Sequence, residues 1–78
     1  MRLLLTIPHF DAAEGGAESY AVTVCQELVR RGHAVRVLAA TGCAGPGVDL
    51  VLGSLDEAPR QVVEFAADLH LDWGLNVP

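Results

Sequence analysis

The residues best suited to chemistry lie in one short segment, between residues 8 and 18. It contains the glycine pair Gly15 and Gly16, and its polar side chains are those of His9, Asp11, Glu14 and Glu18. Glycines let a ligand approach the backbone closely, and a helix that begins directly after them offers unpaired amides and a partial positive charge. Such an arrangement favours a phosphate or diphosphate. A short glycine pair is more often just a turn that leads into a helix, so both interpretations stay open.

The polar side chains of this segment also have two interpretations each. Asp11 and Glu14 are placed to accept hydrogen bonds from sugar hydroxyls, although solvated loop acids are the more common case. Glu18 can serve a ligand, but an acid in a first helical turn usually complements the helix dipole. His9 follows a predicted strand, where catalytic groups often lie. No partner for His9 is visible, and we assign no catalytic residue.

The motifs that are missing exclude several classes of enzyme. The glycine pair fits neither the GxGxxG fingerprint nor the P-loop pattern, which argues against a nicotinamide enzyme and a P-loop nucleotide hydrolase. Cys25 and Cys43 lack the spacing of a metal or redox site. We therefore expect free thiols in a reducing cytosol and no metal ion.

The remaining ring side chains have plain structural explanations. His33 is expected to be structural, and His70 to lie in the core or to form a hydrogen bond. Trp73 either stacks on a flat ligand or packs beneath the edge of the sheet.

Composition limits the partners that the chain can have. Its 78 residues make one small domain, with a net charge of −5, no lysine and 51% hydrophobic residues. The five arginines form no stripe, so nucleic acid is rejected as the main partner. The apolar start is too short for a signal peptide, and no stretch approaches the length of a membrane span.

The first half of the chain predicts a strand, a helix and a second strand. Residues 3–7 form an apolar run typical of a strand covered on both faces, and Pro8 ends it. A helix begins after Gly16 and stops at Gly32. A second strand follows at residues 34–40. The expected apolar face of the helix comprises Ala17, Tyr20, Ala21, Val24 and Leu28.

The second half predicts another strand, helix and strand. Residues 48–52 form the third strand, and Ser54 begins a tight turn that leads into a helix from about Pro59. Residues 68–73 form the fourth strand. The expected inward face of the second helix comprises Val62, Phe65, Ala66 and Leu69.

These elements predict an α/β fold, a partial doubly wound parallel sheet with the element order β-α-β-β-α-β. In the strand order 3-2-1-4 the winding reverses between the first and fourth strands, and ligands bind at such a reversal. The predicted crevice therefore lies between residues 8–16 and residues 73–78.

Three pieces of the chain resemble the start of family-4 glycosyltransferases of the GT-B fold. They are residues 1–8, the Gly-Gly-Ala-Glu run at 15–18, and residues 28–38 with their Arg-Arg-Gly-His step. They occur in the family's order and at family-like spacing, whereas residues 68–74 fit its fourth strand loosely. The resemblance makes residues 1–78 a partial, acceptor-side, Rossmann-like amino-terminal domain.

The resemblance implies a retaining sugar transferase that needs no metal and takes a nucleotide-diphosphate sugar as its donor substrate. The family's glycine loop reaches the donor diphosphate, a role that carries over to Gly15 and Gly16. His9, Asp11, Glu14 and Trp73 then lie on the acceptor side. Bacterial members often build lipopolysaccharide or other envelope glycans from glycan or lipid-linked acceptors, at the inner, cytoplasmic face of the membrane.

The family's carboxyl-terminal domain, with its paired glutamates and nucleotide pocket, is absent from this sequence. We therefore expect the chain alone to be inactive, as the front piece of a transferase. The alternative is a small, non-catalytic α/β module that binds a phosphate-bearing ligand or a partner protein. The front piece is favoured, because the tail has no capping element and the predicted fold stops in the middle of a unit. Such a fragment should expose apolar surface from residue 69 to residue 77, whereas a finished module should unfold cooperatively as a monomer or a defined oligomer.

Overall fold

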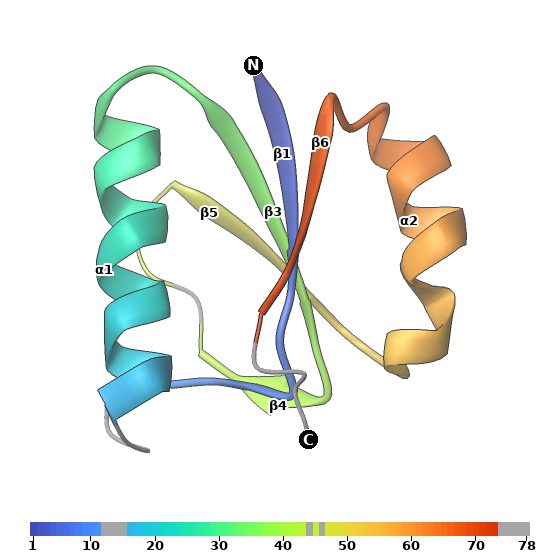
Figure 1. Cartoon of the computed structure of the whole chain (residues 1–78), viewed down its shortest axis with the longest axis horizontal. Helices are drawn as coiled ribbons and strands as arrows, with labels where there is room; N and C mark the ends of the chain where they lie inside the picture. The colour runs from blue at the N-terminus through green and yellow to red at the C-terminus, as the bar shows by residue number, and fades with distance from the viewer. Residues whose placement is uncertain (12–15, 44, 46, 74–78) are drawn as a thin grey trace.

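The computed structural model describes residues 1–11, 16–43, 45 and 47–73. Its main feature is a four-stranded parallel sheet with the order β5-β3-β1-β6 (Figure 1). The strands are β1 (Arg2–Thr6), β3 (Ala34–Ala39), β5 (Val48–Leu52) and β6 (Leu69–Asp72). Numbered along the chain, these strands are the first, second, third and fourth. The predicted order 3-2-1-4 is therefore confirmed.

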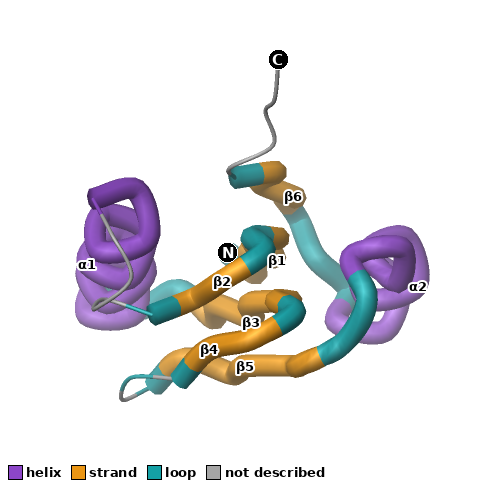
Figure 2. The backbone as a smooth tube through the Cα atoms, turned by 90° about the horizontal axis from the view of Figure 1, so that it is seen from below, coloured by secondary structure: helices purple, strands orange, loops and turns teal. Residues whose placement is uncertain are grey.

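One helix lies on each side of this sheet (Figure 2). Helix α1 (Gly16–Arg30) covers one face, and helix α2 (Ala58–Phe65) covers the other. Strand β6 lies at the end of the sheet, so its far edge has no neighbouring strand among the described residues. The structure is thus mixed α/β, as predicted.

The alternation of side chains along the strands separates two layers of core. Leu3, Leu5 and Ile7 join Val35 and Val37 in the apolar cluster that packs under α1. The residues between them, such as Leu4 and Leu38, are fully buried on the opposite face, where Phe65 of α2 lies. Because the sheet is covered on both sides, its central strands are mostly apolar, with Arg36 as the charged exception inside β3.

Helix α1 is rotated relative to the prediction. Ala21 is buried as expected, but its buried neighbours are Val22 and Cys25, and Val24 is only half-buried. Tyr20 is 63% exposed, so its assignment to the apolar face was wrong. The helix packs over β3 and β5 as well as over the mini-strand β2 (His9–Phe10). Tyr20 instead lies beside Trp73, at the end of β6.

The turn before α2 is confirmed. A 3₁₀ turn, Leu55–Glu57, is capped by the Ser54 hydroxyl, and α2 then begins with Pro59 in its first turn. The helix is shorter than expected because Ala66 takes a left-handed conformation and ends it. Phe65 is buried as predicted. Ala66 is exposed and Leu69 belongs to β6, so both were wrongly placed on the inward face.

A second, very small parallel sheet was not predicted. It pairs β2 with β4 (Thr41–Gly42), in the segments that follow β1 and β3. The described residues of the connection from β3 to β5 form no helix. The connection passes beside α1, where Gly45 approaches Gln26 and Gly47 approaches Val29. The described residues of this connection therefore run beside α1, in a parallel connection that usually contains a crossover helix.

Candidate functional site

The candidate site lies at the carboxyl ends of the parallel strands, which form the lower edge of the sheet in Figure 1. The chain leaves β1 at this edge through Ile7 and Pro8, and α1 begins at Gly16 on the same side. Ligands of open α/β sheets bind at such an edge. Two groups of side chains gather there, one around His9 and one around Thr6.

The first group joins β2 to β4. The Nδ1 atom of exposed His9 lies 2.6 Å from the hydroxyl oxygen of Thr41. The neighbouring position, Gly42, has no room for a side chain, because a Cβ there would collide with the carbonyl oxygen of Phe10. Phe10 itself is fully buried and anchors the pair to the core. His9 is thus held by a hydrogen bond at the sheet edge rather than projecting freely.

The second group surrounds Thr6, the last residue of β1. Its hydroxyl donates a 2.6 Å hydrogen bond to Asp72, and the Nε2 atom of His70 lies 3.1 Å from the same oxygen. Since the hydroxyl proton is directed to Asp72, Thr6 accepts from the Nε2–H of His70. Thr6 is 2% exposed. The Thr6 hydroxyl uses its one proton in the hydrogen bond to Asp72. His70 therefore does not act as a base toward this hydroxyl in the observed geometry.

Trp73 packs directly after β6. Its amide donates a 2.8 Å hydrogen bond to the carbonyl of Thr6, and its ring centre lies 5.6 Å from that of Tyr20. Trp73 is half-buried against the apolar cluster under α1. Trp73 therefore packs at the edge of the sheet, beside Tyr20 of α1.

The residues predicted to form the site are only partly described. Gly16 is the first residue of α1, and Asp11 is half-buried directly after β2. Glu14 and Gly15 lie outside the described residues, as does the tail that was expected to complete the crevice. The structure therefore brings His9 and Trp73 to one edge of the sheet and leaves the centre of the predicted crevice undescribed.

Sequence reasoning missed Thr6, Thr41 and Asp72. Their signal was polarity at the end of an otherwise apolar strand. Thr6 is the one polar residue in the run 3–7, and Asp72 closes β6 in the same way. Strands β1 and β6 are paired with Thr6 opposite Asp72. The predicted strand order places β1 beside β6, but the register that sets Thr6 opposite Asp72 is not visible in local sequence.

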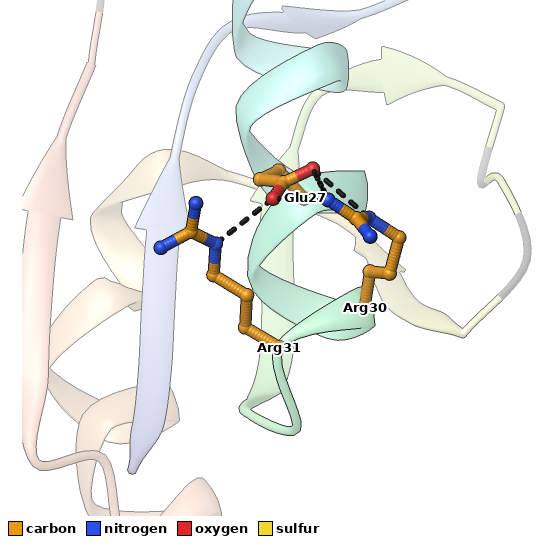
Figure 3. A network of polar contacts seen from close by, with 3 residues as sticks. All are labelled: Glu27, Arg30 and Arg31. Carbon is orange, nitrogen blue, oxygen red and sulfur yellow. Dashed lines mark hydrogen bonds and ion pairs between the residues drawn. The ribbon is translucent and has the colours of Figure 1, made fainter.

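A shallow cavity lies elsewhere, on the flank of α1. It has a volume of about 320 Å³ and is lined by Thr23, Val24, Glu27, Leu28 and Arg31. Its acid, Glu27, binds both Arg30 and Arg31 through contacts of 2.7 and 2.8 Å (Figure 3). These two guanidinium groups lower the pKa of Glu27. Because Glu27 is already paired, the cavity offers no free acid for catalysis.

The other reactive side chains do not join the site. Cys25 is buried, and this burial raises the pKa of its thiol to about 11, whereas Cys43 is exposed. The Nδ1 atom of His33 is buried without a hydrogen-bond partner among the described residues. Within the same residues no group of histidine, cysteine and acidic side chains is arranged to hold a metal ion.

Comparison with known proteins adds no relative. The chain matches no protein-family model, no curated protein and no solved structure. Neither helix of the described residues has the length and apolar character needed to cross a membrane.

Proposed function

We propose that the chain is the front part of the amino-terminal, Rossmann-like domain of a family-4 glycosyltransferase. In this proposal Gly15 and Gly16 receive the diphosphate of a sugar nucleotide at the start of α1. His9, Asp11, Glu14 and Trp73 lie toward the acceptor, a glycan or a lipid-linked sugar such as a lipopolysaccharide precursor. The protein then works in the cytoplasm, at the inner face of the membrane.

One observation carries this proposal beyond the sequence resemblance. The strand order β5-β3-β1-β6 makes β1 a central strand, and α1 begins at Gly16 on the carboxyl side of it. A helix of this length presents free amide groups and a partial positive charge at its start. The proposal is therefore supported by the agreement between the order of the sequence motifs and the start of α1 on the carboxyl side of β1.

The alternative is a non-catalytic module that binds a phosphate-bearing ligand or a partner protein. The exposure of Leu69, 45%, is what a front piece should show at this edge. A finished module should instead unfold cooperatively as a monomer or a defined oligomer.

Titration of the ¹⁵N-labelled chain with nucleotide-diphosphate sugars tests the proposal. UDP-glucose and GDP-mannose are the first probes, with glucose and inorganic phosphate as controls. We expect amide shifts at the start of α1 with a diphosphate sugar, weaker shifts with phosphate and none with glucose. Equal shifts with phosphate and with the sugar nucleotides would favour the non-catalytic module. No shift with any of the probes contradicts phosphate and diphosphate binding by the loop and leaves it a turn that leads into the helix.

Two variants that each add one negative charge make this titration specific. Gly16→Asp adds a negative charge at the start of α1 and should weaken diphosphate binding at least tenfold. Val63→Asp adds the same charge on α2, where the side chain is 77% exposed, and should bind as the unmodified chain does. Equal binding by both variants places the anion elsewhere.

Transfer activity gives a second test. The purified chain should transfer no sugar from any sugar nucleotide, because the paired glutamates of the family lie in its other domain. Measurable transfer would show that residues 1–78 contain the complete catalytic machinery, which contradicts the proposed division.

A further inference from the structure

The end of β6, beside the end of β1, is the place where the winding of the sheet reverses. From β1 the chain passes through α1 to β3, whereas from β5 it passes through α2, on the opposite face, to β6 (Figure 2). Ligands of open α/β sheets bind outside the carboxyl ends of the strands at such a reversal. The two strands end in Thr6 and Asp72, which lie directly opposite each other. These two residues therefore stand at the position where a ligand is expected.

Asp72 is held in place by Thr6. Its Oδ1 atom accepts the 2.6 Å hydrogen bond from the Thr6 hydroxyl, which in turn accepts from His70. Thr6 is buried, whereas Asp72 is exposed. A carboxylate accepts through both of its oxygens, and the second oxygen of Asp72 has no hydrogen-bond partner among the described residues. The network thus orients Asp72 and leaves one oxygen for a donor from outside.

No arginine contacts Asp72 in the described part of the chain, which includes all five arginines, and the sequence has no lysine. Four arginines bind carboxylates elsewhere and the fifth lies over the Phe65 ring; they are Arg30, Arg31, Arg36, Arg60 and, over the ring, Arg2. An exposed carboxylate without such a partner repels an anionic ligand and accepts hydrogen bonds from uncharged donors. Hydroxyl groups are donors of this kind.

Trp73 flanks the same strand end from the other face. Side chains of successive residues in a strand leave on opposite faces, so Asp72 and Trp73 lie on the two sides of the end of β6. The Trp73 ring is half-buried, and its centre lies 5.6 Å from that of the Tyr20 ring. Aromatic faces carry partial negative charge and attract the C–H groups of a ring that stacks on them. A sugar combines such C–H groups with hydroxyl donors, so it matches both sides of this strand end.

We propose that Asp72 determines the charge class of the acceptor, which is an uncharged sugar ring. One hydroxyl of this sugar donates to the second oxygen of Asp72, and its C–H groups lie against the aromatic pair of Tyr20 and Trp73. Thr6 and His70 are positioning residues, because they orient the carboxylate and do not touch the sugar. The charge of Asp72 rejects uronic acids and sugar phosphates. The inference rests on the proposed function, which places the acceptor at this edge.

Titration of the ¹⁵N-labelled chain with methyl glycosides tests the inference. The neutral probes are methyl glucoside and methyl galactoside, each up to about 100 mM and each compared with its anionic uronide. Trp73 is the only tryptophan, so its indole N–H signal reports this end of β6. We expect the Asp72 amide and this indole signal to shift with at least one neutral glycoside and not with its uronide. No shift with either neutral glycoside, or equal shifts with the uronide, overturns the inference.

Asp72→Asn separates the charge of this side chain from its shape. The variant should bring the affinities for a neutral glycoside and for its uronide within roughly twofold of each other, because the repulsion is removed. Glu64→Gln is the matched control, since it removes the same charge from an exposed position on α2, and it should keep the preference for the neutral sugar. A preference that survives Asp72→Asn overturns the role of Asp72.

Variants of Thr6 test the positioning role. Thr6→Val removes the hydroxyl that orients Asp72 and should weaken binding of the neutral glycoside by about threefold or more. Thr6→Ser keeps a hydroxyl at this position and should bind as the unmodified chain does. Circular dichroism checks that each variant is folded. Equal affinities of Thr6→Val and Thr6→Ser contradict the positioning role.

The same titrations separate failure of this inference from failure of the proposed function. Binding of UDP-glucose at the start of α1, without a shift from either neutral glycoside, overturns only the inference. Binding of a glycoside at Asp72, without affinity for a diphosphate, contradicts only the proposed donor.

Discussion

The guanidinium carbon of Arg2 lies 4.3 Å from the centre of the Phe65 ring, and the Nε atom of Arg2 donates a 2.7 Å hydrogen bond to the Phe65 carbonyl. Arg36 lies over the same ring, with its guanidinium carbon 4.6 Å from the centre. Phe65, at the end of α2, is only 6% exposed. One aromatic ring therefore ties α2 to two strands, β1 and β3.

Phe65→Leu separates the cation–π contribution from burial. Leucine keeps much of the buried apolar surface but loses both ring contacts, and we expect a loss of about 1–2 kcal/mol in the free energy of unfolding. Phe65→Ala also opens a cavity and should cost about 3–5 kcal/mol. Urea unfolding followed by circular dichroism measures both. Val63→Ala, on the exposed side of α2, should change stability by less than about 0.5 kcal/mol.

The Thr6–Asp72 contact should be energetically coupled. A double-mutant cycle with Thr6→Val and Asp72→Ala removes the 2.6 Å hydrogen bond from either side. We expect a coupling free energy of about 1 kcal/mol, because Asp72 is exposed and water replaces part of the lost bond. Strictly additive losses would show that the hydrogen bond adds nothing to stability.

Two glycines distinguish backbone strain from a steric collision. Gly32 has φ +94° and nothing within 4 Å of an added Cβ, so Gly32→Ala should cost about 1 kcal/mol. Gly42 has φ +151°, and an alanine there also collides with the carbonyl of Phe10, so this variant should cost more than the Gly32 variant. It should also weaken the β2–β4 pairing. Thermal unfolding ranks the two, and the ring signals of His9 report the pairing. Equal losses at both positions would contradict the steric explanation.

The two thiols should differ in reactivity at pH 8. The thiol pKa of Cys25, raised from 9.0 to about 11, leaves about a hundredfold less thiolate than an ordinary cysteine. With a disulfide reagent we expect one fast equivalent from exposed Cys43 and a second only after denaturation. Cys43→Ser should abolish the fast equivalent. A fast equivalent that survives this substitution would mean that Cys25 is accessible.

The Glu27 pairs should make part of the stability of α1 depend on pH. Arg30 and Arg31 lower the pKa of Glu27 in the folded chain, below its ordinary value of 4.5. The stabilisation is therefore fully present above pH 4.5 and is lost as the pH falls through the folded pKa. Glu27→Gln should be less stable than the unmodified chain at pH 7, and the difference should vanish near pH 2. Because Glu27 is exposed, high salt should shrink the difference.

The main sheet could be predicted from the sequence because its signals are local. An apolar run ended by Pro8, a helix stopped by Gly32 and a turn before Pro59 each predicted a boundary within a few residues. The rotation of α1 was not predictable in this way. Whether Tyr20 or Val22 is buried depends on which strands the helix covers, and tertiary packing decides this.

The candidate site was less predictable than the fold. His9 was noticed from its place after a strand, but its partner Thr41 lies 32 residues further along the chain. The cluster of Thr6, His70 and Asp72 depends on the pairing of β1 with β6. Contacts that form only when distant strands pair cannot be recognised from the spacing of residues along the chain. The lone polar residue in an apolar strand was the one sign available.

The late position of β6 has a consequence for folding. Strand β1 appears first during synthesis, but Leu3 pairs with Leu69, and Asp68 binds the backbone of Arg2 across 66 residues. The pairing of β1 with β3 requires a much shorter loop and can form earlier. Until β6 leaves the ribosome, β1 is an open edge that any extended peptide can approach. A nascent chain stalled before residue 69 should therefore be the species that chaperones bind most strongly.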